Sequence, residues 1–395
     1  MAGYCILQRF VLCTFALLLL TLTGAAQQPP AGKVIDLTAA DGVNIKATYF
    51  AGKPGPGVLL LHQCNQARKA WDGLAAQLAA AGLNVLTMDY RGYGESGGKR
   101  FNDLTPAENS QMVNQIWPQD TSVAIRYLES QPGVKREVIG LGGASCGVNQ
   151  AIQVARRHPE VKSLVLLSGS SDREGRLFLQ KAAGLPMFMA AADDDGNGGA
   201  SGIMEWLYGL SANPGNRFIR YPTGGHGNEM FAQRKELPGM IVDWFDTTLV
   251  KTPGKAPAGG THKPSDVAGM LALIDEPGGP AKAAPALEDV RRKDPRAAAS
   301  LEFTINLIGY EHLQTGDIKG AIEIFRFNVE NYPGSANAYD SLGDAYLAGG
   351  QNDLALQSSR KAIDLLSSDA SLDAQRRNDI RESAEQKIKQ LVKHD

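Results

Sequence analysis

The chain has 395 residues, of which 43% are hydrophobic and 21% are charged, and its formal net charge is −2. This length allows two or three domains, and this apolar content supports a packed core rather than a disordered chain. The near-neutral charge and the lack of a long basic run argue against a nucleic-acid partner.

Residues 1–26 have the pattern of a secretory signal peptide. Arg9 precedes the apolar run 10–22, and small residues at 24–26 offer a cleavage site. The run is shorter than the roughly 20 apolar residues that a transmembrane helix needs. We therefore expect an exported protein, periplasmic or secreted, with no membrane span in the mature chain. An uncleaved membrane anchor is the alternative.

The four cysteines divide between the signal and the mature chain. Cys5 and Cys13 lie in the signal, so that Cys64 and Cys146 are the cysteines left after cleavage. Export would place these two in a compartment where disulfides persist.

Strand and helix signals alternate between residues 34 and 250. Short continuous apolar runs are typical of strands buried on both faces of a sheet, and longer alanine- and leucine-rich segments are typical of helices. In chain order we expect a hairpin over 34–50, a strand over 57–62, a helix over 69–81, a strand over 84–90, a helix over 119–130, a strand over 137–142, a helix over 145–157, strands over 162–169, 186–192 and 216–222, and a helix over 237–250. This alternation predicts an α/β domain over 33–250, with a mostly parallel, doubly wound sheet that binds ligands beyond the carboxyl ends of its strands.

The composition changes after residue 250. Residues 251–295 are rich in Pro, Gly and Ala and are predicted to form a linker, with a short helix at "DVAGMLALI". Beyond it, small and apolar residues recur at an offset of 34, as Gly309 and Gly343 do. This offset is the signature of tetratricopeptide (TPR) repeats. We predict a TPR-like all-α domain over 296–395 that binds a protein partner, with a plain helical bundle as the alternative.

A candidate nucleophile lies at the junction of a predicted strand and helix. The segment "GASCG" at 143–147 matches the G-x-S-x-G turn, in which flanking glycines let a strand and a helix pass close together around an exposed serine. This centres the turn on Ser145. If Cys146 were the nucleophile, Ala144 and Val148 would flank it, and the β-branched valine would crowd the turn. Cys146 therefore remains only as the alternative.

A serine nucleophile needs a base and an acid that orients the base. His226, in "YPTGGHGNEMF", follows the last predicted strand in a glycine-rich loop that can return over the serine. The acid should follow the strand ending at residue 192, where "DDD" supplies Asp193, Asp194 and Asp195. The register favours Asp195, with Asp194 as the alternative. No other acidic or histidine cluster supports a metal site here. The remaining histidines lie on a helix, in the linker and among the repeats: His158, His262, His312 and His394.

Two backbone amides should stabilise the oxyanion of such a site. One belongs to the residue after the nucleophile, Cys146, and the other to the loop "LLLHQCNQ", where Cys64 is the expected donor. His62 is expected to support this loop rather than to take part in the chemistry.

These motifs together resemble the α/β-hydrolase superfamily, and within it the dienelactone-hydrolase-like esterases. The resemblance rests on "LLLHQCN", "DYRGYGES", "GASCG" and "GGHG". It departs from that family at Gln63, where glycine is usual, and at Ser145, where dienelactone hydrolases have cysteine. The resemblance implies a serine hydrolase of the carboxylesterase type that needs no cofactor. It would cleave a small-molecule carboxylic ester, a thioester or a peptide through an acyl-enzyme.

Two hypotheses remain beside this interpretation. A non-catalytic protein could bind partners through the repeats and use the hydrolase domain as a scaffold. Cys64 and Cys146, which fall on both predicted oxyanion residues, could form a disulfide that closes a loop of about 80 residues and stabilises the fold by about 4 kcal/mol. Two free thiols packed under the site are the alternative.

Overall fold

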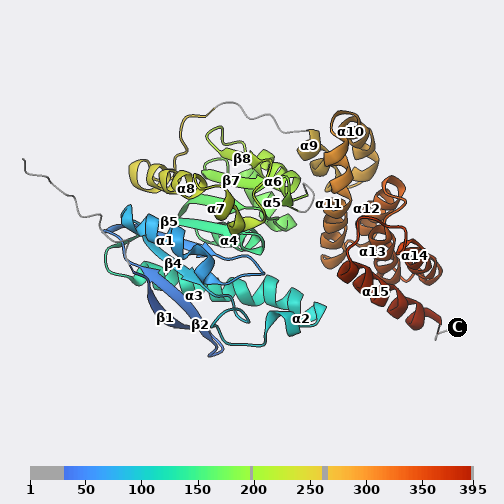
Figure 1. Cartoon of the computed structure of the whole chain (residues 1–395), viewed down its shortest axis with the longest axis horizontal. Coiled ribbons are helices and arrows are strands. Elements are labelled where there is room, and N and C mark those ends of the chain that lie inside the picture. Colours follow the sequence, from blue (N-terminus) through green and yellow to red (C-terminus); the bar gives the residue numbers. More distant parts are fainter. Residues whose placement is uncertain (1–30, 196–198, 260–265, 393–395) are drawn as a thin grey trace, which may run out of the picture.

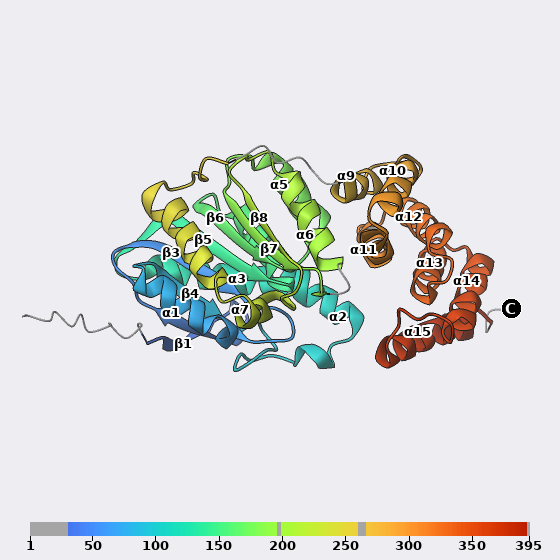
Figure 2. The same cartoon turned by 45° about the horizontal axis from the view of Figure 1, so that its top comes forward.

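The computed structural model describes residues 31–195, 199–259 and 266–392 (Figure 1). The predicted signal peptide, residues 1–26, lies outside the described residues. Figures 1 and 2 show an α/β body that carries the sheet and a second, all-helical body beside it. Within the described ranges, no helix combines the length and the apolar character needed to cross a bilayer.

The α/β body is built on an eight-stranded sheet with the order β1-β2-β4-β3-β5-β6-β7-β8. β2 pairs antiparallel with both β1 and β4, and the strands from β4 to β8 are parallel. The strands are β1 (Lys33–Thr38), β2 (Asn44–Phe50), β3 (Gly55–Leu61), β4 (Asn84–Met88), β5 (Val134–Ala144), β6 (Val161–Leu167), β7 (Met187–Ala192) and β8 (Arg217–Tyr221). The predicted mostly parallel sheet is confirmed.

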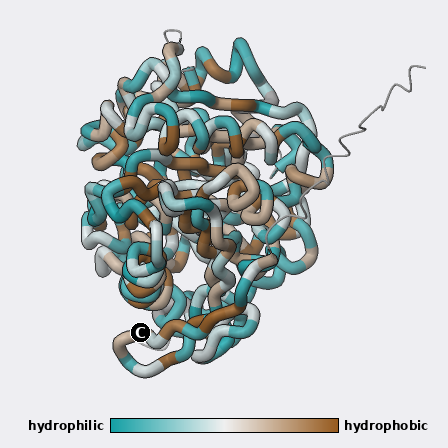
Figure 3. The backbone as a smooth tube through the Cα atoms, turned by 90° about the vertical axis from the view of Figure 1, so that its left-hand side faces the viewer, coloured by the Kyte–Doolittle hydropathy of each residue, from teal (hydrophilic) through white to brown (hydrophobic). Residues whose placement is uncertain are grey.

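Helices cover both faces of the sheet. Each central strand packs against both layers of helices, because successive side chains point to opposite faces. On β3, Leu59 and Leu61 belong to the core beneath α3 (Trp117–Ser130), α4 (Cys146–Arg157), α5 (Arg173–Lys181) and α6 (Gly199–Leu210). Val58 and Leu60 belong to the core beneath α1 (Asp72–Ala80) and α8 (Leu237–Phe245). The hydropathy colouring of Figure 3 shows hydrophobic segments inside the molecule and hydrophilic ones around its edge. The central strands are therefore apolar on both sides.

Four α-helices in the described part of the α/β body do not appear among the sequence predictions. They are α2 (Pro106–Gln111), α5, α6 and α7 (Met230–Gln233). α2 and α7 are too short to show a helical period. α6 has the sequence "GASGIMEWLYGL", in which glycines interrupt the period that identifies a helix.

The segment 251–295 is predicted to be a linker with one short helix at "DVAGMLALI". The structure contains that helix and a second one that was not predicted. These are α9 (Asp266–Ile274) and α10 (Gly279–Lys293). Their buried apolar residues, such as Leu271 and Leu287, share a core with Trp206 of α6 and with α11. The Pro and Gly residues between them form the turn that joins two packed helices. The helical body therefore begins at Asp266, ahead of the position 296 expected from the sequence.

The following helices pack in succession and carry the 34-residue offset. They are α11 (Pro295–Gln314), α12 (Ile318–Asn331), α13 (Ala336–Ala348), α14 (Asn352–Leu365) and α15 (Ala374–Val392). A Cβ atom built on Gly309 would lie 2.5 Å from the ring of Phe325, and one on Gly343 would lie 3.1 Å from Ser359 Oγ. Glycine thus lets each helix pair approach closely. The all-helical domain is confirmed, and its assignment as TPR stays a prediction.

A buried arginine joins the two bodies. Arg176 of α5 is only 3% exposed and forms ion pairs with Glu311 (2.6 Å) and Asp275 (3.0 Å) of the helical body. Its guanidinium lies 4.5 Å from the centre of the Trp206 ring. Burial raises the pKa of Glu311 to about 7. The two bodies are therefore fastened by charges as well as by the shared apolar core.

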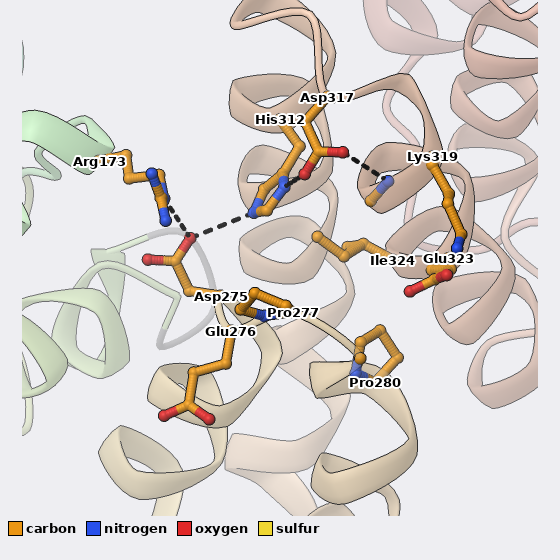
Figure 4. A pocket seen from close by; sticks show the side chains of 12 residues that line it. Arg173, Asp275, Glu276, Pro277, Pro280, His312, Asp317, Lys319, Glu323 and Ile324 are labelled. Atoms are coloured by element: carbon orange, nitrogen blue, oxygen red, sulfur yellow. Dashed lines mark hydrogen bonds and ion pairs between the residues drawn. The ribbon is translucent and has the colours of Figure 1, made fainter.

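Figure 4 shows the neighbouring part of this interface. Asp275 lies between Arg173 and His312, and the His312 ring also contacts Asp317 at 2.8 Å. These side chains line a pocket of about 190 Å³, which shares no residue with the candidate catalytic set.

Replacing Arg176 with methionine should lower the free energy of unfolding by about 3 kcal/mol. The methionine keeps a long apolar side chain beside Trp206 but leaves Asp275 and Glu311 without their buried counter-charge. Urea denaturation at pH 8, where Glu311 is largely ionised, measures the loss. Arg173→Met is the matched control, because Arg173 is 43% exposed and only 4.0 Å from Asp275. If Arg173→Met lowered the free energy of unfolding as much as Arg176→Met does, Arg176 would not be the main ionic link between the two bodies.

Candidate active site

A strained turn presents Ser145 at the end of β5. The strand ends at Ala144, α4 begins at Cys146, and Ser145 between them has φ 53° and ψ −120°. Such a backbone costs a non-glycine residue about 1–3 kcal/mol and persists only where its surroundings impose it. A Cβ atom on Gly143 would lie 2.1 Å from the Gly147 carbonyl oxygen. The strand–turn–helix context predicted for "GASCG" is therefore present, and its glycines are needed for the close approach.

His226 lies in a glycine loop that returns to this turn. The loop follows β8, and the two glycines flanking His226 have positive φ, 74° at Gly225 and 56° at Gly227. A Cβ atom on Gly227 would lie 3.3 Å from the Ala144 Cβ atom. The residue after His226 thus packs against the residue before Ser145, although the two are far apart in the sequence.

The three consecutive aspartates after β7 have separate partners. Asp195 Oδ2 lies 2.8 Å from His226 Nδ1. Asp194 Oδ1 accepts the backbone N–H groups of Gly224 (2.9 Å) and Gly225 (3.0 Å). Asp193 is paired with Arg220 at 2.7 Å. The structure therefore brings Asp195 to the imidazole and places Asp194 under the loop that carries it.

The Asp195 carboxylate also affects the pKa of the His226 imidazole. The hydrogen bond to Asp195 raises the pKa of His226 above its usual 6.5, and this effect outweighs burial, which acts in the opposite direction. The His226 side chain is 34% exposed and that of Asp195 is 10% exposed. When Nδ1 donates to Asp195, Nε2 of the neutral ring is left as a proton acceptor.

A disulfide joins the two predicted oxyanion residues. The structure pairs Cys64 with Cys146, with their Cα atoms 5.8 Å apart. The Cys146 amide is the first of α4, so it has no carbonyl partner within the helix. Among the residues that the structure describes, the N–H of Cys64 donates no backbone hydrogen bond. Two amides from separate turns are thus held near the Ser145 turn, and the bonded sulfur of Cys146 is not a free thiolate.

His62 is fully buried and has a structural part in the loop after β3. Its Nδ1 lies 2.7 Å from the Gln63 carbonyl oxygen, and its Nε2 accepts the Tyr90 N–H at 3.1 Å. Burial lowers the pKa of His62 to about 4, so the ring is neutral near pH 7. With both ring nitrogens engaged, His62 supports the loop.

The far end of this loop is anchored by the "DYRGYGES" motif. Asp89, which is fully buried, accepts the backbone N–H of Arg68 (2.7 Å) and of Glu95 (2.9 Å), and it forms an ion pair with the Arg68 guanidinium. A Cβ atom on Gly94 would lie 2.3 Å from Asp89 Oδ2. The motif therefore fixes both its own turn and the segment that follows the Cys64 loop.

The sequence pattern indicates no role for Gln63 beyond its departure from the usual glycine. The structure places its side chain, fully buried, between the Cys64 loop and the His226 loop. The available signal in the sequence was a glutamine where the resembled family has glycine, but this signal did not indicate which residue Gln63 would bind.

The remaining histidines do not join this site. His158 pairs with Glu160 at 2.7 Å, and His312 lies at the interface between the two bodies. His262 and His394 lie outside the described residues. Within the described part of the chain, no three or more His, Cys, Asp or Glu side chains are grouped so that they could hold a metal ion.

Part of the chain is similar to known proteins. Residues 56–198 match a family model described as the alpha/beta hydrolase fold. Thiohydrolase aneE of Aspergillus aculeatus is 29% identical over 133 residues, which are 33% of this chain and 39% of that protein. Thiohydrolase apmlB of Arthrinium phaeospermum is also 29% identical, over 33% of this chain and 41% of that protein. An uncharacterised protein of Mycobacterium tuberculosis strain H37Rv is 32% identical over 142 residues, 35% of this chain and 46% of that one.

The match to these relatives spans less than half of their own length. Among solved structures, a Pyrococcus furiosus esterase superimposes with a TM-score of 0.45 at 17% identity, over 55% of this chain and 93% of that one. The family model, the strand order and the turn at Ser145 agree on one architecture. The α/β body has the α/β-hydrolase fold, and an all-helical region follows it.

Proposed function

We propose that this protein is a serine hydrolase that cleaves a carboxylic ester through an acyl-enzyme. The observation that carries the proposal is the 2.8 Å contact between His226 Nδ1 and Asp195, in a loop packed against the residue before Ser145. A serine on a strained turn, an imidazole and an orienting carboxylate are the parts that acyl transfer requires.

Each part has a defined step in this mechanism. His226 Nε2 takes the proton from the Ser145 hydroxyl as its oxygen attacks the ester carbonyl carbon. The amides of Cys64 and Cys146 stabilise the negative charge that develops on the carbonyl oxygen. His226 then returns the proton to the leaving alcohol. A water molecule, deprotonated by the same base, releases the acid and restores Ser145.

Turnover of p-nitrophenyl acetate, combined with covalent labelling by a fluorophosphonate, tests the proposal. We expect hydrolysis, with a single label on the peptide that contains Ser145. Failure of the wild-type protein to react with either reagent would favour the non-catalytic scaffold.

A thioester is the second substrate class to test. The support is that two relatives carry the name thiohydrolase, although each match covers 33% of this chain. Comparing kcat/KM for an alkyl ester and an alkyl thioester with the same acyl group separates the two classes. A higher value for the thioester would replace the ester assignment.

We also propose export of the chain and a TPR-like, partner-binding role for the helical body. The signal-like pattern of residues 1–26 and the disulfide, a bond typical of oxidising compartments, support export. The recurrence of small and apolar residues at an offset of 34 supports the TPR-like assignment. Cell fractionation tests the first proposal, and a protein found in the cytoplasm would contradict it. Crosslinking in intact cells tests the second, and crosslinks confined to the α/β body would contradict it.

Removing the disulfide should weaken both the fold and the rate. The bond spans 82 positions of sequence, so replacing Cys64 and Cys146 together with alanine should lower the free energy of unfolding by about 4 kcal/mol. We expect kcat to fall about tenfold, less than the 10²–10³ that the loss of a whole donor costs. Thermal unfolding and ester turnover, each with and without dithiothreitol, measure both effects. Reductant should weaken the wild type and leave the double variant unchanged. A wild type that is insensitive to complete reduction would contradict both effects.

A further inference from the structure

The short loop after β3 is tied to three other loops by three consecutive residues. These ties are His62 to Tyr90, Gln63 to Asn228, and Cys64 to Cys146. The first fixes the loop against the end of β4, and the third fixes it against the Ser145 turn. The middle tie is the one that reaches the loop carrying His226.

Gln63 makes this tie through both ends of its amide. Its Oε1 accepts the backbone N–H of Asn228 at 2.8 Å, and its Nε2 donates to Asn65 Oδ1 at 2.7 Å. A Cβ atom on Gly227 would lie 2.3 Å from the same Oε1. The amide of Gln63 is thus oriented from one side by Asn65 and holds the two residues after His226 from the other.

The His226 imidazole is held from two directions as a result. Asp195 contacts the ring at Nδ1, while Gln63 binds the backbone two residues further along. The carboxylate can set the rotation of the ring, but it cannot set the distance of the loop from the Ser145 turn. Gln63 can set this distance, because its own loop is bonded covalently to the residue after Ser145.

The buried surroundings make the bond hard to replace with water. Gln63 is 0% exposed and Asn228 is 6% exposed. A buried backbone N–H that loses its acceptor is costly, so the loop would shift in order to satisfy it elsewhere. A shift of about 1 Å in a catalytic group can cost about 10²-fold in rate.

We propose that Gln63 is a positioning residue, whose side chain keeps the His226 imidazole in reach of Ser145 by holding the backbone of the His226 loop. This proposal rests on the proposed serine hydrolase function. Position 63 is where the chain departs from the resembled pattern, which usually has glycine. We assign the glutamine at this position a role in aligning the base with the nucleophile.

Two substitutions test it in the full-length protein. Gln63→Met keeps the length of the side chain and removes the acceptor, while Gln63→Asn keeps an amide that is too short to reach Asn228. We expect kcat for p-nitrophenyl acetate to fall about 10- to 100-fold in both variants, with KM changed by less than about twofold. The rate of fluorophosphonate labelling at Ser145 should fall by the same factor. Gln150→Met is the matched control, because Gln150 is also 0% exposed but donates to the Val113 carbonyl oxygen. It should react at close to the wild-type rate.

A measurement independent of activity separates this proposal from the proposed function. Amide hydrogen exchange over residues 226–229 should become about tenfold faster in both Gln63 variants and stay unchanged in Gln150→Met. If wild-type protein neither turns over ester nor takes the label, the hydrolase function fails. Unchanged exchange in the Gln63 variants would still overturn the positioning role on its own. Wild-type labelling rates in these variants, or a loss confined to KM, would overturn it as well.

Discussion

Ser145→Ala is expected to lower kcat for p-nitrophenyl acetate about 10⁶-fold and to abolish fluorophosphonate labelling. In the proposed mechanism the hydroxyl oxygen forms the acyl-enzyme, and the neighbouring Cys146 sulfur is held in a disulfide. What rate remains would come from the two amides acting on a directly attacking water molecule, as in other hydrolases that have lost their serine. The variant should fold, because alanine fits wherever a serine has been accommodated in the turn.

Ser163→Ala is the matched control for the loss of a buried hydroxyl. Ser163 lies on β6 and is fully buried, where its Oγ contacts Trp244 at 2.9 Å and Thr248 at 2.8 Å. This change should lower stability while Ser145 keeps its label. If Ser145→Ala retains wild-type labelling, the nucleophile lies elsewhere and the mechanism proposed above is wrong.

Asp195→Asn is expected to lower kcat about 10⁴-fold. Asparagine keeps the shape of the side chain but removes the charge that stabilises the imidazolium, and its amide can hold the ring in the wrong tautomer.

The pH dependence of the reaction should change as well. In the wild type, activity should be lost below a pKa that lies above 6.5, because the Asp195 hydrogen bond favours protonated His226 and the protonated ring is not a base. Without the carboxylate, the largest effect that raises the pKa of His226 is lost while burial still lowers it, so this limb of the profile should move to lower pH.

Asp194→Asn supplies the control at the adjacent position. Its side-chain oxygen still accepts the N–H groups of Gly224 and Gly225, so we expect kcat within about fivefold of the wild-type value. A profile of kcat/KM from pH 5 to 9 for both variants compares the two aspartates directly. A larger loss at Asp194 than at Asp195 would reverse the assignment of the acid.

Local patterns were sufficient to predict the α/β body and to select most of the residues that the structure brings together at the candidate site. Strand runs such as "GVLLLH" are continuous and apolar because β3 is buried on both faces, and this property is visible in a few consecutive residues. The segment "GASCG" shows its turn in the same way, since the close approach of a strand and a helix requires glycine at fixed positions. His226 could be chosen because it alone follows a predicted final strand.

Helices that depend on distant partners were harder to predict. α10 contains Pro, Gly and Ala in proportions typical of a linker, and it is stable because it buries apolar residues in the core that it shares with Trp206 and α11. α6 is likewise held by its packing rather than by a regular helical period. In these segments tertiary contacts override the local preference of the sequence.

The mostly parallel sheet, the serine turn, the candidate imidazole and the two cysteines at the predicted oxyanion positions could be predicted from the sequence, because the signal for each lies in neighbouring residues. The three-dimensional arrangement was needed to show that Asp195, and not Asp194, contacts His226, since the direction of a side chain in a run of three aspartates depends on the loop that it faces. It alone also showed that Arg176 fastens the two bodies and that Gln63 binds the His226 loop. The last of these contacts joins residues 165 positions apart, and no local pattern carries information over that distance.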